Sequence, residues 1–314
     1  MADEGSVYDL LVVGGGINGV GIARDAVGRG LSVLLCEQDD LASHTSSAST
    51  KLIHGGLRYL EHFEFGLVRK ALQEREVLLR AAPHLIAPLR FVMPHAGNLR
   101  PAWMMRIGLF LYDHLSRREL LPASEAIDLR THPAGAPLRD RARRGFAYSD
   151  GWVDDARLVI SNAMDAAERG ARILTRTRFA SAERGASQWQ ATLRSSRDGA
   201  QRRVTARCIV NATGPWVADV LRTSLQIEPK RHVRAAKGSH IVVRRLFDHD
   251  CAYTFQNLDK RVVFAIPYES DYTLIGTTDV EYRDDPSRVS ISAEEIAYLC
   301  EAVNRYLARP VAPA

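Results

Sequence analysis

A glycine-rich turn between an apolar run and a helical pattern is the feature that most constrains the fold of this 314-residue chain. Leu10–Val13 is a short apolar run of the kind that a buried parallel strand shows. Gly14–Gly19 follows at once, and the apolar residues of 22–27 then recur at helical spacing up to Gly30. Since Val33–Cys36 is the next apolar run, the pattern predicts a strand–helix–strand unit over residues 9–37.

The spacing of Gly14, Gly16 and Gly19 predicts a dinucleotide site, because the triplet directly follows a strand and opens a helix. Gly14 permits the tight turn, Gly16 lets the backbone approach a pyrophosphate, and Gly19 lets the helix pack closely on the strand. The helix N-terminus offers N–H groups to the phosphates. Glu37, at the end of the second strand, is placed to bind a ribose diol. This fingerprint alone leaves both FAD and NAD open.

A hydroxyl-rich segment, residues 43–50, follows the strand–helix–strand unit and leads to the sequence His54-Gly55-Gly56. It stands in the place where a second strand–helix–strand repeat could have followed. Its hydroxyl groups are suited to hydrogen bond a flavin and its phosphates, which favours FAD. The alternative interpretation is a serine-rich loop without a ligand.

The remaining patterns predict the following elements. A helix is expected over about 65–82 and another over 155–168, whereas 90–145, rich in proline and arginine, is expected to be an irregular insertion. Short strands are expected at 172–177, 189–193 and 204–210, with a hairpin turn at Asp198-Gly199. An antiparallel region follows with strands at 239–243, 251–256, 261–266 and 272–277, and 308–314 shows no pattern that packs a core.

Composition excludes several classes of protein. With 46% hydrophobic and 25% charged residues the chain is globular, and a net charge of +5 without a basic block argues against nucleic acid. The cysteines at 36, 208, 251 and 300 have neither disulfide-framework nor metal-ligand spacing, so we expect no metal. No secretory signal is recognisable, and the apolar stretch 103–112 is interrupted by Arg106. We expect a cytoplasmic protein, or one that is peripheral on the inner face of the cell membrane.

Several longer stretches resemble, in order, one enzyme family. They are Val13–Gly30, Thr45–Glu61, Leu99–Trp103, Tyr148–Leu158, Val210–Trp216, Lys237–His240 and Ile275–Tyr282. Together they resemble the FAD-dependent, aerobic and quinone-linked glycerol-3-phosphate dehydrogenases, over almost the whole chain.

The resemblance implies an α/β fold in which an FAD-binding Rossmann-like domain is interleaved with an antiparallel β-sheet cap, as in D-amino-acid oxidase. The implied FAD-domain segments are 1–90 and 148–230, and the cap segments are 91–147 and 231–307, followed by an unstructured tail, 308–314. The implied reaction is oxidation of sn-glycerol 3-phosphate to dihydroxyacetone phosphate by hydride transfer to flavin N5. Electrons then pass to a membrane quinone.

The resemblance also implies the site residues. The expected cofactor-binding residues are Gly14, Gly15, Gly16, Ile17, Asn18, Gly19, Glu37, Gln38, Thr45, Ser46, Ser47, Lys51, His54, Gly55, Gly56, Ala212, Thr213 and Gly214. The expected catalytic and substrate residues are His54, Arg58, Tyr59, Lys237, His240 and Thr278. Arg58 and Tyr59 match positions near the substrate phosphate, and an arginine fork suits a phosphate dianion. His54 is a candidate proton acceptor.

Alternatives stay open on three points. The helix expected near Trp103–Tyr112 is either a core helix or, with Arg100 and Arg106, a basic amphipathic patch at a membrane surface where the quinone is reached. The family pattern continues into Gly-Val-Arg-Pro and Gly-Gly-Lys-x-x-Thr-Tyr-Arg segments that this sequence lacks. The resemblance is therefore to a C-terminally truncated member, and the alternatives are an impaired FAD-binding remnant or a flavin oxidase of amines or hydroxy acids. A homo-oligomer is one option for its assembly.

Overall fold

The computed structural model describes residues 7–95, 100–139, 143–231, 233–259 and 261–313. Contacts within the chain divide it into two units, each assembled from separate segments. Unit 1 consists of Met1–Ser49, Asp154–Ala235 and Arg283–Arg288, and unit 2 of Thr50–Val153, Ala236–Tyr282 and Val289–Ala314. The domain boundaries predicted above remain a prediction, because these units are defined by contacts within the chain and not by a cofactor.

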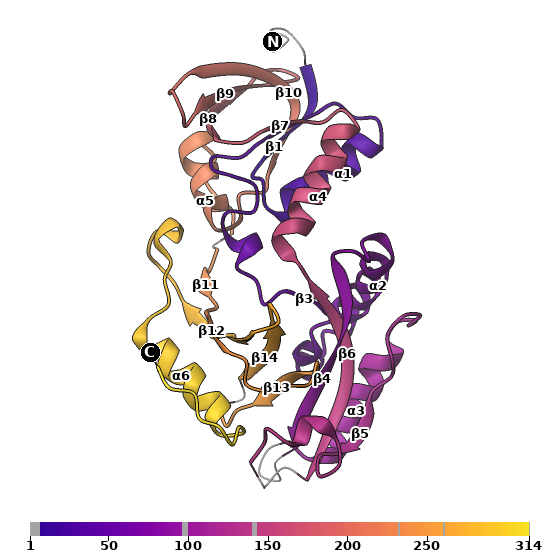
Figure 1. Ribbon diagram of the computed structural model, residues 1–314. Helices are drawn as coiled ribbons and strands as arrows, with labels where there is room; N and C mark the ends of the chain where they lie inside the picture. The colour runs from indigo at the N-terminus through magenta and orange to yellow at the C-terminus, as the bar shows by residue number, and fades with distance from the viewer. Residues whose placement is uncertain (1–6, 96–99, 140–142, 232, 260, 314) are drawn as a thin grey trace. The chain divides into compact units, whose positions relative to one another are not determined.

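Unit 1 is built on a six-stranded sheet with the order β7-β2-β1-β10-β9-β8 (Figure 1). The strands are β1 (Val7–Val13), β2 (Val33–Cys36), β7 (Arg172–Leu174), β8 (Thr177–Arg184), β9 (Trp189–Ser195) and β10 (Gln201–Asn211). The first four in this order run parallel, and β10, β9 and β8 form antiparallel pairs. The helical segments are α1 (Ile17–Gly28), η1 (Thr45–Ser47), α4 (Asp155–Glu168), η4 (Gly214–Trp216), α5 (Val217–Asp219), η5 (Val220–Ser224) and η6 (Pro286–Arg288).

Alternation along β1 and β2 places apolar side chains on both faces of this sheet. Val12, Val33 and Leu35 pack against α1 and α4, which lie side by side. Their neighbours Leu11 and Leu34 pack on the opposite face with residues of β8 and β9. Since strands covered on both faces must be apolar throughout, the continuous apolar runs of the sequence are explained. The predicted strand–helix–strand unit and the hairpin between β9 and β10 are confirmed.

Unit 2 is built on an eight-stranded mixed sheet with the order β12-β15-β14-β13-β4-β6-β3, in which β5 also pairs with β6. Its strands are β3 (Leu52–Ile53), β4 (Ile86–His95), β5 (Glu125–Asp128), β6 (Arg144–Val153), β12 (His240–Arg244), β13 (Ala252–Gln256), β14 (Val262–Tyr268) and β15 (Tyr272–Gly276). β11 (Ala236–Lys237) and β16 (Val280–Glu281) form a separate pair. The helical segments are η2 (Leu57–His62), α2 (Phe65–Ala81), α3 (Ala102–His114), η3 (Pro133–Gly135) and α6 (Ala293–Asn304).

Two cores sandwich the sheet of unit 2, and neighbouring residues of a strand belong to opposite cores. Val92 on β4 packs in the core that α6 covers, whereas Phe91 and Met93 pack in the core that α2 and α3 cover. On β14, Ala265 packs in the core that α6 covers and Ile266 packs in the core that α2 and α3 cover. Because side chains alternate along a strand, one strand supplies both cores. The sheet is antiparallel as predicted, apart from the parallel pairing of β13 with β4.

The prediction that 90–145 is irregular was wrong. This range contains most of β4, all of α3 and β5, and the start of β6, and β4 pairs with β6 from Ile86↔Val153 to His95↔Arg144. Pro88 and Pro94 hid the strand, since proline lacks an N–H group and is rare inside a sheet. Each proline here lies opposite a glycine, Gly151 or Gly145, in the ladder. Two ranges lie outside the described residues: 96–99, which includes Leu99 of the resemblance, and 140–142.

Two features near the C-terminal end of the sequence differ from the sequence analysis. It made no prediction for a helix between 278 and 307, where α6 begins with a capping box in which Ser292 and Glu295 bond reciprocally. The tail was expected to be unstructured, but Val311 is buried in the α6 core. Its N–H donates to Asn304 Oδ1 and its carbonyl accepts from Asn304 Nδ2, both at 2.7 Å, so one side chain ties down the tail.

Candidate functional site

The glycine turn of unit 1 allows three chain segments to meet at backbone distance. Gly14 has a φ of +111°, and a Cβ placed on it would lie 2.5 Å from the carbonyl oxygen of Ala212. A Cβ on Gly19 would lie 1.8 Å from the carbonyl oxygen of Gly14. Both positions therefore require glycine, because the end of β10 and the first turn of α1 pack directly on the turn.

The N-terminus of α1 has the features of a phosphate-binding helix end. It has no side-chain cap and no acidic residue in its first turn, so its positive dipole end is not neutralised by the helix itself. The hydroxyl oxygen of Ser46 accepts the Ile17 N–H at 3.0 Å, which holds the hydroxyl-rich segment against the turn. This contact joins two motifs that the sequence analysis assigned to one cofactor.

Glu37 supports the glycine turn from the end of β2. Its carboxylate is buried, and Oε2 accepts the Gly15 N–H at 2.7 Å while Oε1 accepts the Asp39 N–H at 2.9 Å. A carboxylate has about four lone-pair sites, so these two bonds leave capacity for ribose hydroxyls. Gln38 follows, and its carbonyl accepts the hydroxyl of Ser196.

The segment Ala212–Gly214 is shaped by Asn211 at the end of β10. The Asn211 side chain accepts from the Thr213 hydroxyl at 2.7 Å and donates to the Val217 carbonyl at 2.9 Å. These bonds hold the segment beside Gly14. Together with the uncapped helix and the buried Glu37, this backbone cradle fits the ADP half of a dinucleotide.

Ligand atoms of Glu37, Asp39 and His44 lie within 4.8 Å of one another, the distance range of a metal site. The Glu37 oxygens already accept backbone N–H groups, and Asp39 Oδ2 is 2.9 Å from His44 Nε2. These contacts fold the loop after β2, and we assign no metal to them. In the same unit the Ser49 hydroxyl donates to Asp155 at 2.7 Å, which fixes the end of the hydroxyl-rich segment.

In unit 2 the sequence His54-Gly55-Gly56 forms a tight turn after β3. Gly56 has a φ of +72°, and a Cβ on Gly55 would lie 2.5 Å from Leu72 Cδ2 and 2.8 Å from a ring carbon of Tyr112. The Gly55 N–H donates to the Tyr112 hydroxyl at 2.7 Å, and the Gly56 N–H donates to His54 Nδ1 at 3.0 Å. The glycines are buried while the His54 side chain is exposed.

Arg58 and Tyr59 lie on η2, directly after this turn, and both side chains are exposed. Among the described residues the Arg58 guanidinium makes neither a hydrogen bond nor an ion pair. An arginine without a protein partner beside a histidine turn is chemically suited to bind an anion such as a phosphate.

Lys237 and Thr278, both expected near the substrate, contact Glu295 on α6. Lys237 Nζ lies 2.7 Å from Glu295 Oε2 and 2.7 Å from the Ser290 carbonyl, and the Thr278 hydroxyl donates to Glu295 Oε1 at 2.7 Å. Burial of Glu295 raises its pKa, but the bonds from Lys237, the Ser292 N–H, Thr278 and Ser239 outweigh this and lower the pKa to about 2. Lys237 is therefore neutralised by a protein carboxylate.

His240 lies at the start of β12, opposite Gly276 of β15. Its Nε2 is 2.9 Å from the Thr50 hydroxyl, and a Cβ on Gly276 would lie 2.0 Å from the imidazole ring. The imidazole therefore packs over the strand pair, and its bond to Thr50 ties β12 to the segment that precedes the His54 turn.

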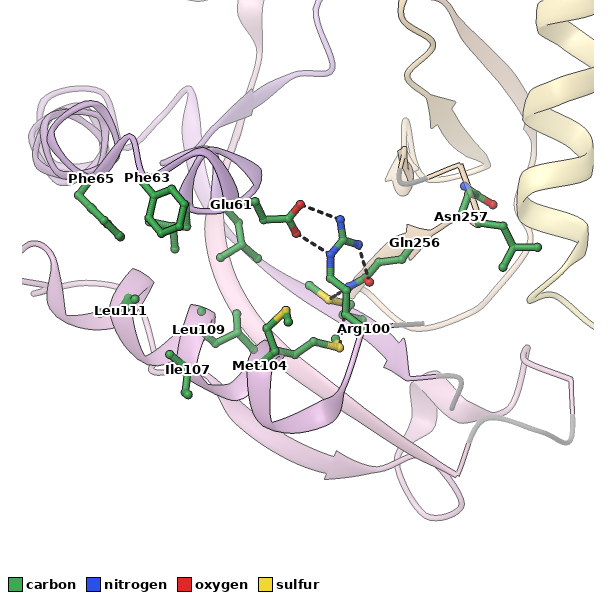
Figure 2. A pocket seen from close by; sticks show the side chains of 16 residues that line it. Glu61, Phe63, Phe65, Arg100, Met104, Ile107, Leu109, Leu111, Gln256 and Asn257 are labelled. Atoms are coloured by element: carbon green, nitrogen blue, oxygen red, sulfur yellow. Dashed lines mark hydrogen bonds and ion pairs between the residues drawn. The ribbon is translucent and has the colours of Figure 1, made fainter. Parts of the chain in front are cut away.

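A cavity of about 760 Å³ lies within unit 2, beside α3 (Figure 2). Its wall is mainly apolar and includes Met104, Ile107 and Phe63. At its polar end the Arg100 guanidinium donates to Glu61 at 2.8 Å and to Gln256 at 2.9 Å. Arg100, which the sequence suggested as a membrane-facing cation, is thus an internal ion-pair partner.

Helix α3 has one side buried in a core and one exposed apolar side, so the membrane-surface alternative stays a prediction. Met105, Leu109 and Tyr112 are buried in a core of unit 2, as in a core helix. On its other side Trp103 is 65% exposed and Phe110 56% exposed, and Ile107 and Met104 are exposed beside them. In the described part of the chain, no helix is both long enough and apolar enough to cross a membrane.

Sequence reasoning missed the polar groups that hold the candidate residues. Glu295 carried a recognisable signal, the Ser-x-x-Glu capping pattern at 292–295. Asp150, which contacts Tyr112 behind the His54 turn, lies within the stretch 148–158 that carries the resemblance. Only the structure brings it to the turn, since the two are far apart in sequence.

Comparison with known proteins agrees with this geometry. Residues 9–313 match the family model described as FAD dependent oxidoreductase. The chain belongs to this family. The family name supplies the cofactor that the glycine turn and the hydroxyl-rich segment predicted, and the predicted fold class is likewise confirmed.

Among the proteins to which the chain is similar are a glycerol-3-phosphate dehydrogenase and a D-erythritol 1-phosphate dehydrogenase. Over 308 residues the chain is 58% identical to the glycerol-3-phosphate dehydrogenase of Pseudomonas aeruginosa, covering 98% of this chain and 59% of that protein. It is 56% identical to the D-erythritol 1-phosphate dehydrogenase of Brucella abortus, covering 96% and 60%. The solved glycerol-3-phosphate dehydrogenase of Bacillus halodurans, complexed with FAD, is 29% identical with a TM-score of 0.74, covering 96% and 53%. The chain thus spans about three fifths of these curated relatives.

Replacing Gly19 by alanine tests the glycine cradle. The added Cβ would meet the Gly14 carbonyl at 1.8 Å, so we expect Gly19→Ala to abolish FAD retention, measured as flavin absorbance per purified chain. Gly21→Ala is the matched control, because a Cβ there meets nothing within 4 Å in the same helix, and alanine favours a helix by about 0.5–1 kcal/mol. Equal flavin content in the two variants would contradict the cradle.

The depressed pKa of Glu295 makes a prediction about acid stability. An ionised Glu295 stabilises the fold above the ordinary value of 4.5, and this stabilisation is lost as the pH falls toward about 2. Glu295→Gln cannot titrate, so its free energy of unfolding is expected to be lower at pH 7 and to fall less steeply from pH 4.5 to 2. Denaturant unfolding at several pH values measures this, and parallel curves for wild type and variant would be the opposite result.

Proposed function

We propose that this chain carries the FAD-dependent oxidation of a polyol phosphate, with sn-glycerol 3-phosphate as substrate and dihydroxyacetone phosphate as product. The observation that carries the proposal is Arg58, whose exposed guanidinium has no partner among the residues that the structure describes and lies directly after the His54–Gly55–Gly56 turn. The 58% identity to a glycerol-3-phosphate dehydrogenase supports the choice of substrate.

FAD, when bound, supplies the acceptor for the two electrons and the hydrogen that leave C2 of the substrate, at flavin N5. In our proposal the ADP half is held by the Gly14–Gly19 turn, Glu37, Gln38 and Ala212–Gly214. We propose that the flavin half is held by Thr45–Ser47 of the hydroxyl-rich segment, by Lys51 and by His54–Gly56.

The chain's own residues bind and orient the substrate. Arg58 is proposed to bind the phosphate dianion through its planar fork, with Tyr59 beside it. His54, exposed on the same turn, is proposed to hydrogen bond the C2 hydroxyl oxygen. Holding the phosphate and the hydroxyl at two fixed points aligns C2, which is the main contribution a protein makes to such a reaction. Lys237, His240 and Thr278 remain proposed site residues, of which Lys237 and Thr278 act through the Glu295 cluster.

A second substrate is favoured by a specific observation, the 56% identity to a D-erythritol 1-phosphate dehydrogenase. Erythritol 1-phosphate shares the phosphate and a hydroxyl two carbons from the ester oxygen, so the same Arg58 and His54 contacts suit both compounds.

We further propose that a quinone receives the electrons at a membrane surface. The support is the exposed apolar side of α3, which includes Ile107 and Phe110, beside the apolar cavity. An apolar helix face of this kind lies in the interface plane of a bilayer without spanning it.

Anaerobic titration of the FAD-loaded chain tests the function. sn-Glycerol 3-phosphate is expected to bleach the visible flavin band, and a soluble quinone is expected to restore it. D-Erythritol 1-phosphate in a parallel cuvette distinguishes the two substrates, and glycine or a hydroxy acid tests the oxidase alternative. Bleaching by an amine but by neither phosphate would overturn the proposal, and a chain that retains FAD without any bleaching would favour an inactive remnant.

Arg58→Ala is expected to raise KM for the phosphate substrate by about 10-fold to 100-fold, as the loss of a charge-assisted contact of about 1.5–3 kcal/mol requires. Flavin content is expected to stay unchanged, because the ADP cradle lies in other segments. Arg117→Ala, which removes an arginine 88% exposed in the same unit, is the control. Equal loss of flavin and of turnover in Arg58→Ala would make Arg58 a structural residue.

Ile107→Asp tests the membrane proposal by placing a charge on the exposed side of α3. Burying an isoleucine side chain contributes about 1.5–3 kcal/mol, so co-sedimentation with anionic phospholipid vesicles is expected to fall about 10-fold or more. Met164→Asp is the control, because Met164 is an exposed apolar residue of α4 in unit 1. Equal vesicle binding by both variants and the wild type would contradict the proposal.

A further inference from the structure

A buried polar network lies directly behind the His54 turn. Arg75 on α2, Tyr112 on α3 and Asp150 on β6 are each no more than 3% exposed. Arg75 Nη1 donates to Asp150 Oδ1 at 2.6 Å, and the Tyr112 hydroxyl lies 2.8 Å and 3.0 Å from the two Asp150 oxygens. The same hydroxyl oxygen lies 2.7 Å from the Gly55 nitrogen. Three elements therefore meet at one backbone N–H group of the turn.

The direction of each hydrogen bond follows from the groups involved. A phenol carries one proton, and burial, followed by the nearby Asp150 charge, raises the pKa of Tyr112 well above its usual range, so the phenol keeps that proton. It donates to the Asp150 carboxylate, and its oxygen is left to accept the Gly55 N–H. The ion pair with Arg75 supplies the opposite charge that Asp150 requires in a buried position.

The same reasoning fixes the proton on His54. A backbone N–H can only donate, so His54 Nδ1 must accept the Gly56 N–H at 3.0 Å. A neutral imidazole whose Nδ1 accepts carries its single proton on Nε2. The outward nitrogen of this exposed side chain is therefore a donor.

We infer that His54 acts as a hydrogen-bond donor through Nε2–H, and that Tyr112 and Asp150 are positioning residues that hold the turn in this state. The inference rests on the proposed function. In that reaction Nε2–H would bind the substrate oxygen and stabilise the negative charge that develops on it as the hydroxyl proton leaves. Because Nε2 has no free lone pair, that proton passes to solvent water rather than to His54. This replaces the expectation that His54 is the proton acceptor.

The tautomer can be measured without turnover. The full chain, purified with FAD and labelled with ¹⁵N in its histidine rings, is examined by long-range ¹H–¹⁵N correlation at alkaline pH, and His54→Gln identifies the His54 signals. We expect a protonated Nε2 and an unprotonated Nδ1. A protonated Nδ1 would overturn the inference, and since no substrate is present, this result is independent of whether the proposed function holds.

Tyr112→Phe tests the positioning role. It removes only the hydroxyl, and Tyr148→Phe is the matched control, because Tyr148 is buried in the same core and its hydroxyl bonds Thr254. We expect a mixture of His54 tautomers in Tyr112→Phe and the wild-type spectrum in Tyr148→Phe. An unchanged tautomer in a folded Tyr112→Phe would overturn the positioning role. If that variant does not fold, Asp150→Asn provides the same comparison.

A kinetic comparison separates donor from base. Glutamine places an N–H donor near the position of Nε2, whereas asparagine places its amide near Nδ1. We expect His54→Gln to keep kcat within about 10-fold of the wild type and His54→Asn to lose more. If His54 were a general base, both variants would lose it equally, and kcat would decrease roughly 100-fold or more in each. That outcome would overturn the donor role. If the wild type does not oxidise either phosphate, the proposed function fails while the NMR result still decides the tautomer.

Discussion

The ladder between β4 and β6 is the interaction on which the rest of unit 2 depends. It runs from Ile86↔Val153 to His95↔Arg144, and β4 also joins β13 and thereby the remaining strands of the sheet. β6 carries Asp150 and pairs with β3, whose last residue precedes His54. The two prolines of β4 are tolerated because small glycines face them across the ladder. The cores on both faces and the candidate substrate turn therefore share one structural support.

Two buried acidic groups organise the polar side of this unit in different ways. Glu295 is surrounded by donors from a helix cap and two strand ends, and it exists as a carboxylate over almost the whole pH range. For Asp150 burial outweighs the stabilising Arg75 charge, so its pKa is raised. A buried ion pair is weak evidence for stability, because desolvation offsets much of the attraction. Its clearer effect is geometric, since each carboxylate brings donors from several elements to one point.

Much of unit 1 could be predicted because its information is local. The apolar run, the glycine triplet and Glu37 lie within thirty residues and follow one another in the order in which they act, so Gly14 and Gly19 were placed correctly. The strand around Pro88 could not be predicted, since its prolines are acceptable only opposite Gly145 and Gly151, which are distant in sequence. The same holds for Asp150 and Tyr112, whose contacts depend on the sheet. Lys237 was expected near the substrate, and its partner Glu295 was missed, because Glu295 lies on a helix, α6, that the sequence analysis did not predict.

The Gly55 position has a consequence for the substrate recognition that we propose. Its backbone is enclosed by the Leu72 side chain and the Tyr112 ring at distances that leave no room for a methyl group. Such a turn does not adapt its shape to the ligand, because any movement displaces two residues of a packed core. The conformational entropy of ordering this turn is lost when the chain folds rather than when substrate binds. In the function that we propose, recognition at this point is therefore by a rigid template, and selectivity between polyol phosphates of different length depends on the residues around the turn.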